Sequence, residues 1–351
     1  MKIFIDDTTL DVCPRRRVLD IRRLRQHLLD NRDTITEDIT AADRVYLFTC
    51  GYNKPMEELS MKTIRLYWEK YGDKLVAAGC LPQMNLAGVR RHFPGTIINN
   101  QMLRNLEMQP VSSKDIGISR GCMGKCSYCV DKIAVGKLQS RPLPACVSDL
   151  RSGLLAGYRS FRIVADDLGA WGQDIGTDFI TLLEKLVSIK VTEEPVDFTL
   201  KLLEINPFWL IKYKDRLQVF KSSLFKDVLI GVQSANDRIL TMMNRNYLIG
   251  DVREIIVKLK EYSRRIGIHI ISGFPTETGQ EFMDSIRFIV STGIDFGFIF
   301  QYSDMEKAPS FHYYPKVIDG ENRLKQASVI LKQHGYKVSP AGLDKLKFNC
   351  P

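Results

Sequence analysis

The sequence lacks any long hydrophobic run. No apolar stretch approaches the length of roughly twenty residues that a membrane-spanning helix needs. Residues 1–7 also lack the charged and then apolar pattern of a signal peptide, since two of them are acidic. These absences argue against a membrane-bound protein, and we expect a cytoplasmic one with no membrane partner.

Histidine is scarce, and this limits the kinds of metal site that the chain can build. The sequence has five histidines, none of which stands at metal-ligand spacing from another: His27, His92, His269, His312 and His334. We therefore assign no histidine a catalytic role.

Neither sign of charge dominates the composition. Fifty basic and forty-one acidic residues give a net charge of +9, which favours acidic or polyanionic partners without identifying one. The basic residues are densest after the first cysteine, at Arg15, Arg16, Arg17, Arg22, Arg23 and Arg25. This group forms either a solvated helix face or a patch that faces the substrate.

The length of 351 residues favours two domains followed by a short tail. Residues 1–105 are expected to form an α/β domain with a parallel sheet, because short apolar runs alternate with helical patterns. The expected strands are 2–5, 45–49 and 75–78, and the expected helices are 18–29 and 56–71. A polar segment at 109–115 is the expected linker.

Residues 106–310 repeat a strand and helix unit six times, which favours a partial (βα)6 barrel, although spacing alone does not exclude an open doubly wound sheet. The expected strands are 116–119, 160–165, 196–203, 228–232, 266–272 and 296–302. Helices are expected at 177–189, 252–264 and 280–291. Residues 311–351 are expected to hold one helix, 321–334, and an irregular tail.

Three of the eight cysteines, Cys122, Cys126 and Cys129, directly follow the first expected barrel strand. Thiolates on one loop at this end of a barrel can hold an iron–sulfur cluster where barrel enzymes place their chemistry. Because a 4Fe–4S cluster has four irons, three cysteines leave one iron open to another ligand. The alternative is a structural zinc site, which would need Cys146 as a fourth ligand.

Cys13, Cys50 and Cys80 each follow an expected strand of the N-terminal domain. The carboxyl ends of neighbouring parallel strands lie at one edge of the sheet, so these three cysteines could converge there. For any single one of them, a buried hydrophobic role is the alternative.

Several motifs resemble those of the radical S-adenosylmethionine (SAM) superfamily and, within it, the methylthiotransferase family. The N-terminal motifs are residues 12–15, 48–50 and 79–83. The central ones are residues 119–122, 139–141, 231–234 and 273–278, with Tyr302 and Ser303 after them. The likeness extends over residues 1–310, and the motifs occur in the family's order.

The resemblance implies two 4Fe–4S clusters. SAM would bind the open iron of the cluster on Cys122, Cys126 and Cys129 and be cleaved reductively to a 5′-deoxyadenosyl radical. The second cluster, on Cys13, Cys50 and Cys80, would carry the sulfur that a further SAM methylates. The product would be a methylthioether, and an electron donor such as flavodoxin or ferredoxin would be needed.

Three departures from the family pattern concern the substrate and SAM sides of the site. Val12 stands where the family has glycine, and the usual asparagine after the first cysteine is replaced within the run Arg15 to Arg17. The pair Asp166 and Asp167 replaces Gln-Asp or Gln-Asn. The family's C-terminal TRAM module is not expected in the short segment after the barrel.

Five residues are candidate SAM contacts: Tyr128, Arg141, Asp167, Glu204 and Gln233. Tyr128 matches an aromatic residue that the superfamily places near the adenine, with core packing as the alternative. Arg141 could hold the SAM carboxylate or the substrate, because its planar fork suits carboxylates. Asp167, Glu204 and Gln233 are chosen because they stand at the ends of expected barrel strands. For these three residues and for Arg141, a surface or supporting role is the alternative.

The sequence thus predicts a monomeric enzyme that inserts a methylthio group into a C–H bond of a peptide or protein side chain. Transfer RNA is the alternative substrate. A radical SAM enzyme with an auxiliary cluster and another outcome (methylation, cross-linking or epimerisation) is the second alternative, and a non-enzymatic iron–sulfur protein is the third. No residue is predicted to act as an acid, base or nucleophile.

Overall fold

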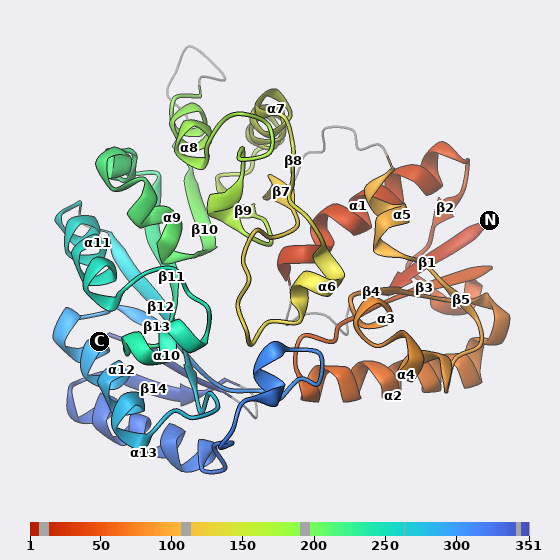
Figure 1. Ribbon diagram of the computed structural model, residues 1–351. Helices are drawn as coiled ribbons and strands as arrows, with labels where there is room; N and C mark the ends of the chain where they lie inside the picture. Colours follow the sequence, from red (N-terminus) through yellow and green to blue (C-terminus); the bar gives the residue numbers. More distant parts are fainter. Residues whose placement is uncertain (7–13, 107–113, 190–196, 263, 342–344, 351) are drawn as a thin grey trace.

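The computed structural model (Figure 1) describes residues 1–6, 14–106, 114–189, 197–262, 264–341 and 345–350. Within these ranges no helix has the length and apolar character that a membrane span requires. Cys13 and residues 109–113 of the expected linker (109–115) lie outside the described residues, and Asp115 at its end belongs to a strand.

The N-terminal domain is a five-stranded parallel sheet in the order β2-β1-β3-β4-β5. The strands are β1 (Lys2–Asp6), β2 (Thr34–Ile35), β3 (Arg44–Thr49), β4 (Leu75–Gly79) and β5 (Thr96–Ile97). The three central strands coincide with the predicted ones, and the two edge strands are only two residues long. A two-residue strand leaves no periodicity in the sequence, which is why neither edge strand was predicted.

Helices cover both faces of this sheet. The helices are α1 (Pro14–Asp30), α2 (Lys54–Tyr71), α3 (Leu81–Met84), α4 (Leu86–Arg90) and α5 (Asn100–Arg104). Ile3 and Phe48 pack with Leu24 of α1, whereas Leu47 packs with Ile64 of α2. Side chains alternate between the two faces of a strand, so β3 contributes to both layers.

The second sheet contains the six parallel strands of a partial barrel, in the order β13-β12-β11-β10-β9-β6. They are β6 (Asp115–Gly117), β9 (Ser160–Val164), β10 (Thr199–Ile205), β11 (Phe225–Gln233), β12 (Arg265–Ser272) and β13 (Phe296–Gln301). Each overlaps a predicted strand. The α/β class and the barrel expectation are therefore confirmed.

Helices surround the outer face of the curved sheet (Figure 1). They are α7 (Leu143–Leu155), α8 (Phe179–Val187), α9 (Pro207–Lys212), α10 (Asp237–Met242), α11 (Ile249–Glu261) and α12 (Gly279–Thr292). The main hydrophobic core lies between these helices and the strands and contains many fully buried aliphatic and aromatic side chains. Because the core occupies the outer face, the inner face of the barrel is left for the polar groups and cavities described below.

The segment after residue 311 corrects one prediction. It contains α13 (Gly320–Gln333), and then β14 (Lys337–Pro340) and β15 (Lys345–Asn349), where an irregular tail was predicted. β15 pairs antiparallel with β13, and β14 pairs antiparallel with β15, so the hairpin extends the barrel sheet. Phe348 is fully buried and packs edge-on against Tyr336, which anchors the hairpin.

The two sheets meet with the carboxyl ends of their strands facing each other across the centre of the molecule (Figure 1). A buried ion pair joins the two halves of the chain, with 2.6 Å between Nη2 of Arg120 and Oδ2 of Asp20 in α1. The amide of Asn100 donates to the carbonyl of Ala134 at 3.3 Å. The residues that follow the N-terminal strands are thereby held beside the cysteine loop of the barrel.

Candidate functional site

The loop of Cys122, Cys126 and Cys129 leaves the barrel through a short antiparallel ribbon, β7 (Ser119–Arg120) with β8 (Gln139–Ser140). Gly121 begins the loop at φ +85°, where a Cβ atom would lie 1.9 Å from the carbonyl oxygen of Lys137. Only glycine fits this close approach. The ribbon and the glycine therefore fix the direction in which the chain enters the cysteine motif.

The three thiols line one cavity of about 230 Å³. The backbone amide of Gly124 donates to Sγ of Cys122 at 3.2 Å. A Cβ atom at Gly124 would lie 3.2 Å from that sulfur and 3.7 Å from Sγ of Cys126, so the glycine keeps the space between the two sulfurs open. In the described residues no three His, Cys, Asp or Glu side chains are grouped to hold a metal ion, so the fit to a cluster rests on this cavity and its thiol donors.

Asp167 contacts the first thiol of the motif. Its Oδ2 lies 3.6 Å from Sγ of Cys122, and its Oδ1 accepts a hydrogen bond from Nε1 of Trp209 at 2.8 Å. Burial raises the pKa of Asp167, and burial together with this carboxylate raises the pKa of the Cys122 thiol to about 12. Without a metal the loop therefore keeps Cys122 protonated, and binding iron would release that proton.

Arg245, which was not predicted, supplies the guanidinium of this cavity. It donates to Sγ of Cys126 at 3.2 Å, to the hydroxyl of Tyr128 at 3.3 Å and to the carbonyl of Gly231 at 2.6 Å. Burial disfavours its charge, yet Tyr128, Tyr247 and Cys126 raise its pKa above the ordinary value. A permanent cation thus lies beside the second thiol of the motif.

Two of the predicted contacts, Gln233 and Glu204, adjoin each other in the same cavity. Nε2 of Gln233 donates to Oε1 of Glu204 at 3.4 Å, and Oε2 of Glu204 lies 2.7 Å from Nδ1 of His269. Gly231 makes room for them, because a Cβ atom there would lie 2.3 Å from Oε1 of Glu204. The carboxylate and the amide can therefore face a ligand together.

Arg141 lies elsewhere. Its Nη1 donates to the carbonyl of Gly117 at 2.6 Å and to Oδ2 of Asp149 at 2.7 Å, and it does not line the cavity of the cysteine loop. The side chain of Cys146 is fully buried in the barrel core and is likewise not part of that cavity. The structure thus keeps the fourth ligand of a zinc site apart from the other three.

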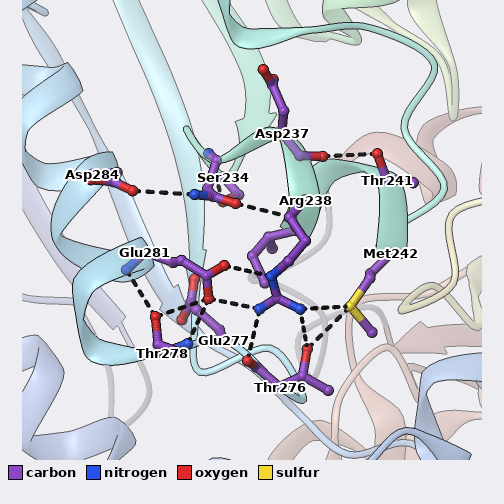
Figure 2. Close-up of polar contacts among 12 residues, drawn as sticks. Ser234, Asp237, Arg238, Thr241, Met242, Thr276, Glu277, Thr278, Glu281 and Asp284 are labelled. Carbon is purple, nitrogen blue, oxygen red and sulfur yellow. Dashed lines mark hydrogen bonds and ion pairs between the residues drawn. The ribbon is translucent and has the colours of Figure 1, made fainter.

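Figure 2 shows the polar contacts that hold α10 against the turn of residues 273–278. Arg238 of α10 donates to both carboxylate oxygens of Glu281, at 2.5 and 2.7 Å, and to the carbonyl of Thr276 at 2.9 Å. This fixes α10 against the turn of residues 273–278, in which Thr276 has φ +72°. At the end of α10, the carbonyl of Met242 accepts a hydrogen bond from Oγ of Ser127 at 2.7 Å. The network therefore supports the cysteine loop from outside.

In the N-terminal domain, Cys50 and Cys80 follow the adjacent strands β3 and β4. The backbone amide of Cys80 donates to the carbonyl of Thr49 at 2.8 Å, next to Cys50. Cys80 is buried in a cluster that includes Val130, the neighbour of Cys129. The strands thus bring two of the three predicted ligands to one sheet edge and close to the barrel loop.

A second and larger cavity, of about 490 Å³, lies between the two domains. Tyr52 and Asn53, just after Cys50, form part of its wall, and Cys129 with Tyr128 forms another part. The inner face of the barrel, with Met305 from the segment after β13, completes it with apolar side chains: Leu203, Leu229, Ile271, Phe298, Phe300 and Met305. The volume and the largely apolar lining are those of a small-molecule or side-chain site.

Residues 116–289 match the family model described as the radical SAM superfamily. The chain is 29% identical over 293 residues to threonylcarbamoyladenosine tRNA methylthiotransferase of Mus musculus, covering 73% of this chain and 50% of that protein. It is 26% identical to the ribosomal protein uS12 methylthiotransferase RimO of Thermosipho africanus, covering 93% and 82% of the two chains. The chain thus spans about half the length of the first of these relatives.

Among solved structures, the radical SAM methyltransferase TsrM from Kitasatospora setae matches with a TM-score of 0.65 and 12% identity, over 98% of this chain and 81% of that one. At this identity the likeness concerns the fold alone. The family match places residues 116–289 in the radical SAM superfamily. The curated relatives to which the chain is similar are named as methylthiotransferases.

Proposed function

We propose that the protein transfers a methylthio group to a C–H bond, using two 4Fe–4S clusters and SAM. The observation that carries the proposal is the larger cavity, whose walls include residues next to Cys50 on one side and Cys129 on the other. A substrate carbon in this cavity would lie between the two cysteine sets. When bound, the clusters and SAM would supply the radical and the sulfur.

Four polar side chains of the smaller cavity have definite tasks toward SAM in this proposal. Arg245 would set its positive charge beside the carboxylate of SAM, one of the two roles predicted for Arg141, because Arg245 lines the cavity and Arg141 does not. Glu204 and Gln233 would accept from and donate to the polar groups of the same molecule. Tyr128 would support its base.

Asp167 would act on the cysteine loop. Its carboxylate is oriented by the indole of Trp209 and lies against Sγ of Cys122. This arrangement would fix the rotamer of the first ligand, since the indole hydrogen bond leaves the carboxylate little freedom. Cys13, Cys50 and Cys80 would hold the second cluster, with Ser60 fixing the backbone of Cys50 through hydrogen bonds of 3.1 and 2.8 Å.

The substrate that we propose is a peptide or protein side chain, and the reductant is a small electron carrier such as flavodoxin or ferredoxin. The larger cavity accommodates one side chain among Leu203, Ile271 and Phe298 while the remainder of a peptide stays outside. Its volume of about 490 Å³ exceeds the need of one side chain, which leaves room for the backbone at the mouth.

Transfer RNA is the second candidate. The relative from mouse acts, by its name, on a tRNA nucleoside. In this chain Phe298 and Phe300 present aromatic rings to the cavity, and such rings stack on unpaired bases.

Product mass tests the proposal. The anaerobically reconstituted protein, supplied with SAM and a reductant, should add about 46 Da to its substrate, the difference made by a methylthio group. Addition of only a methyl group, or the mass loss of a cross-link, would contradict methylthio transfer. Parallel incubations with a mixture of cellular peptides and with unmodified bulk tRNA distinguish the two substrates, because only the true substrate should gain the methylthio mass.

A further inference from the structure

The C-terminal hairpin contributes a lysine to the larger cavity. Lys345 is the first residue of β15 and stands opposite Phe300 of β13 in the antiparallel register. Its Nζ lies 5.7 Å from the ring centroid of Phe300 and 6.0 Å from that of Phe298. All three side chains line the cavity, so the segment predicted to be an irregular tail forms part of its wall.

The ammonium group of Lys345 has no anionic partner within the described part of the chain, where only the two ring contacts are recorded for it. The nearby carboxylate of Glu204 is already engaged by His269 at 2.7 Å. Aromatic rings attract an ammonium group but do not neutralise it, so Nζ of Lys345 is available to pair with a bound anion.

A second lysine supports the same conclusion. Lys201 of β10 also lines the cavity, from the opposite part of the sheet, and the structure records no ion pair or hydrogen bond for it among the described residues. The lining therefore combines an apolar surface with two ammonium groups and with the carboxylates of Asp131 and Glu204. Because His269 engages the carboxylate of Glu204, a ligand that has an apolar part and a negative charge can pair with Lys345.

We infer that Lys345 is a specificity-determining residue that selects a substrate bearing a carboxylate. The apolar part of the substrate would lie against Phe298 and Phe300, and the carboxylate would meet Nζ of Lys345. The identity of this ligand as substrate rests on the function proposed above. The binding preference does not, because it needs no radical chemistry.

A pair of small probes tests the inference without catalysis. 4-Phenylbutyrate has an aromatic ring and a carboxylate, and 4-phenylbutyramide has the same shape without the charge. Titrated calorimetrically into the reconstituted protein, the acid should bind at least about tenfold more tightly than the amide, the ratio expected for one charge-assisted hydrogen bond.

Three variants assign that preference to a residue. Lys345→Met should reduce the ratio between acid and amide to near one, whereas Lys345→Arg should retain most of it. Lys347→Met is the matched control, since Lys347 lies two residues along the same strand and is exposed outside the cavity lining. It should leave the ratio unchanged.

Two results would overturn the inference. One is equal binding of acid and amide by the unmodified protein, and the other is a preference that survives Lys345→Met. A preference that is lost in Lys345→Met but accompanied by no methylthio product on any substrate would uphold the inference and count against the proposed function alone.

Discussion

The two cysteine sets are built in opposite ways. Cys122, Cys126 and Cys129 belong to one loop, are half-exposed, and face a polar cavity that contains Arg245 and Asp167. Cys50 and Cys80 are buried at the ends of two strands, and their neighbours are mostly apolar. The first set is held by its own loop, whereas the second depends on the register of the sheet.

This difference in surroundings matches the ligand that each cysteine set would have to bind. A loop with open polar surroundings can receive a zwitterionic ligand such as SAM, whose charges need partners. Buried sulfurs among apolar side chains suit the exchange of a neutral sulfur group away from water. The comparison therefore favours a division of labour in which the barrel set generates the radical and the N-terminal set delivers sulfur.

The largest expected effect comes from removing either set entirely. Replacing Cys122, Cys126 and Cys129 by alanine should lower the iron content from about eight to about four per chain and abolish SAM cleavage. Replacing Cys13, Cys50 and Cys80 should leave cleavage intact and stop sulfur transfer. Iron analysis and chromatography of the cleavage products measure both.

Cys146→Ala is the control for these variants, since Cys146 lies in the core. It should keep both clusters. Loss of a cluster in Cys146→Ala, or methylthio transfer by the variant without Cys13, Cys50 and Cys80, would contradict the division of labour.

The second expected effect concerns the ion pair that joins the two regions. Arg120 is buried between Asp20 of α1 and Asp166, at 2.6 and 3.4 Å. Arg120→Gln should lower the free energy of unfolding by about 3–5 kcal/mol, because it leaves buried carboxylates without their cation. Denaturant titration of the reconstituted protein measures this.

Arg162→Gln provides the comparison. Arg162 pairs with Asp115 at 2.5 Å, but its side chain is 41% exposed. Solvent screening should limit the loss to about 0–1 kcal/mol. Equal losses in the two variants would show that the junction contributes no more than an ordinary surface pair.

A third, smaller effect separates Arg245 from Arg141. Arg245→Lys should weaken SAM binding by about tenfold, since lysine cannot reproduce the contacts to Cys126 and Tyr128 that hold the cation in the cavity. Arg141→Lys should leave SAM affinity unchanged while lowering stability, because Arg141 pairs with Asp149 away from the cavity. Equilibrium binding of SAM to the two reconstituted variants shows which arginine acts on SAM. Weaker binding by Arg141→Lys than by Arg245→Lys would favour Arg141, as the sequence predicted.

The last comparison concerns two serines, one for each cysteine set. Ser60→Ala removes both hydrogen bonds to the backbone of Cys50 and should cost about 1–3 kcal/mol, because a buried amide loses its partner. Ser127→Ala removes one hydrogen bond to the carbonyl of Met242 and should cost about 1 kcal/mol. Thermal unfolding compares the two, and a larger loss in Ser127→Ala would mean that the barrel loop is the more dependent on its surroundings.

The sequence predicted the six barrel strands and three of the five N-terminal ones because each contains apolar residues in a short run or in alternation. It did not predict the hairpin of β14 and β15. Lysines at 337, 345 and 347 interrupt the apolar pattern there, and β15 is stabilised by Phe348, a single buried anchor. Pairing with β13 across some fifty residues is a tertiary effect that no local pattern reports.

The two cysteine sets were predicted from two different signals in the sequence. The spacing of Cys122, Cys126 and Cys129 is itself the signal, whereas Cys50 and Cys80 became candidates only through expected strand ends. Arg245 had neither signal. Its partners come from α9, β11 and the cysteine loop, so its role depends on three segments that meet only in the fold.

The hairpin has a further consequence for how the protein behaves at high concentration. A partial barrel leaves two strand edges that could pair with another chain. One edge, β6, is met by α1, where Arg22 donates to the carbonyl of Asp115 at 2.7 Å. The other edge is β14, which is only four residues long, begins with Lys337 and ends with Pro340. A charged start and a proline end make a poor template for pairing, so the last strand of the sheet protects the chain against association edge to edge.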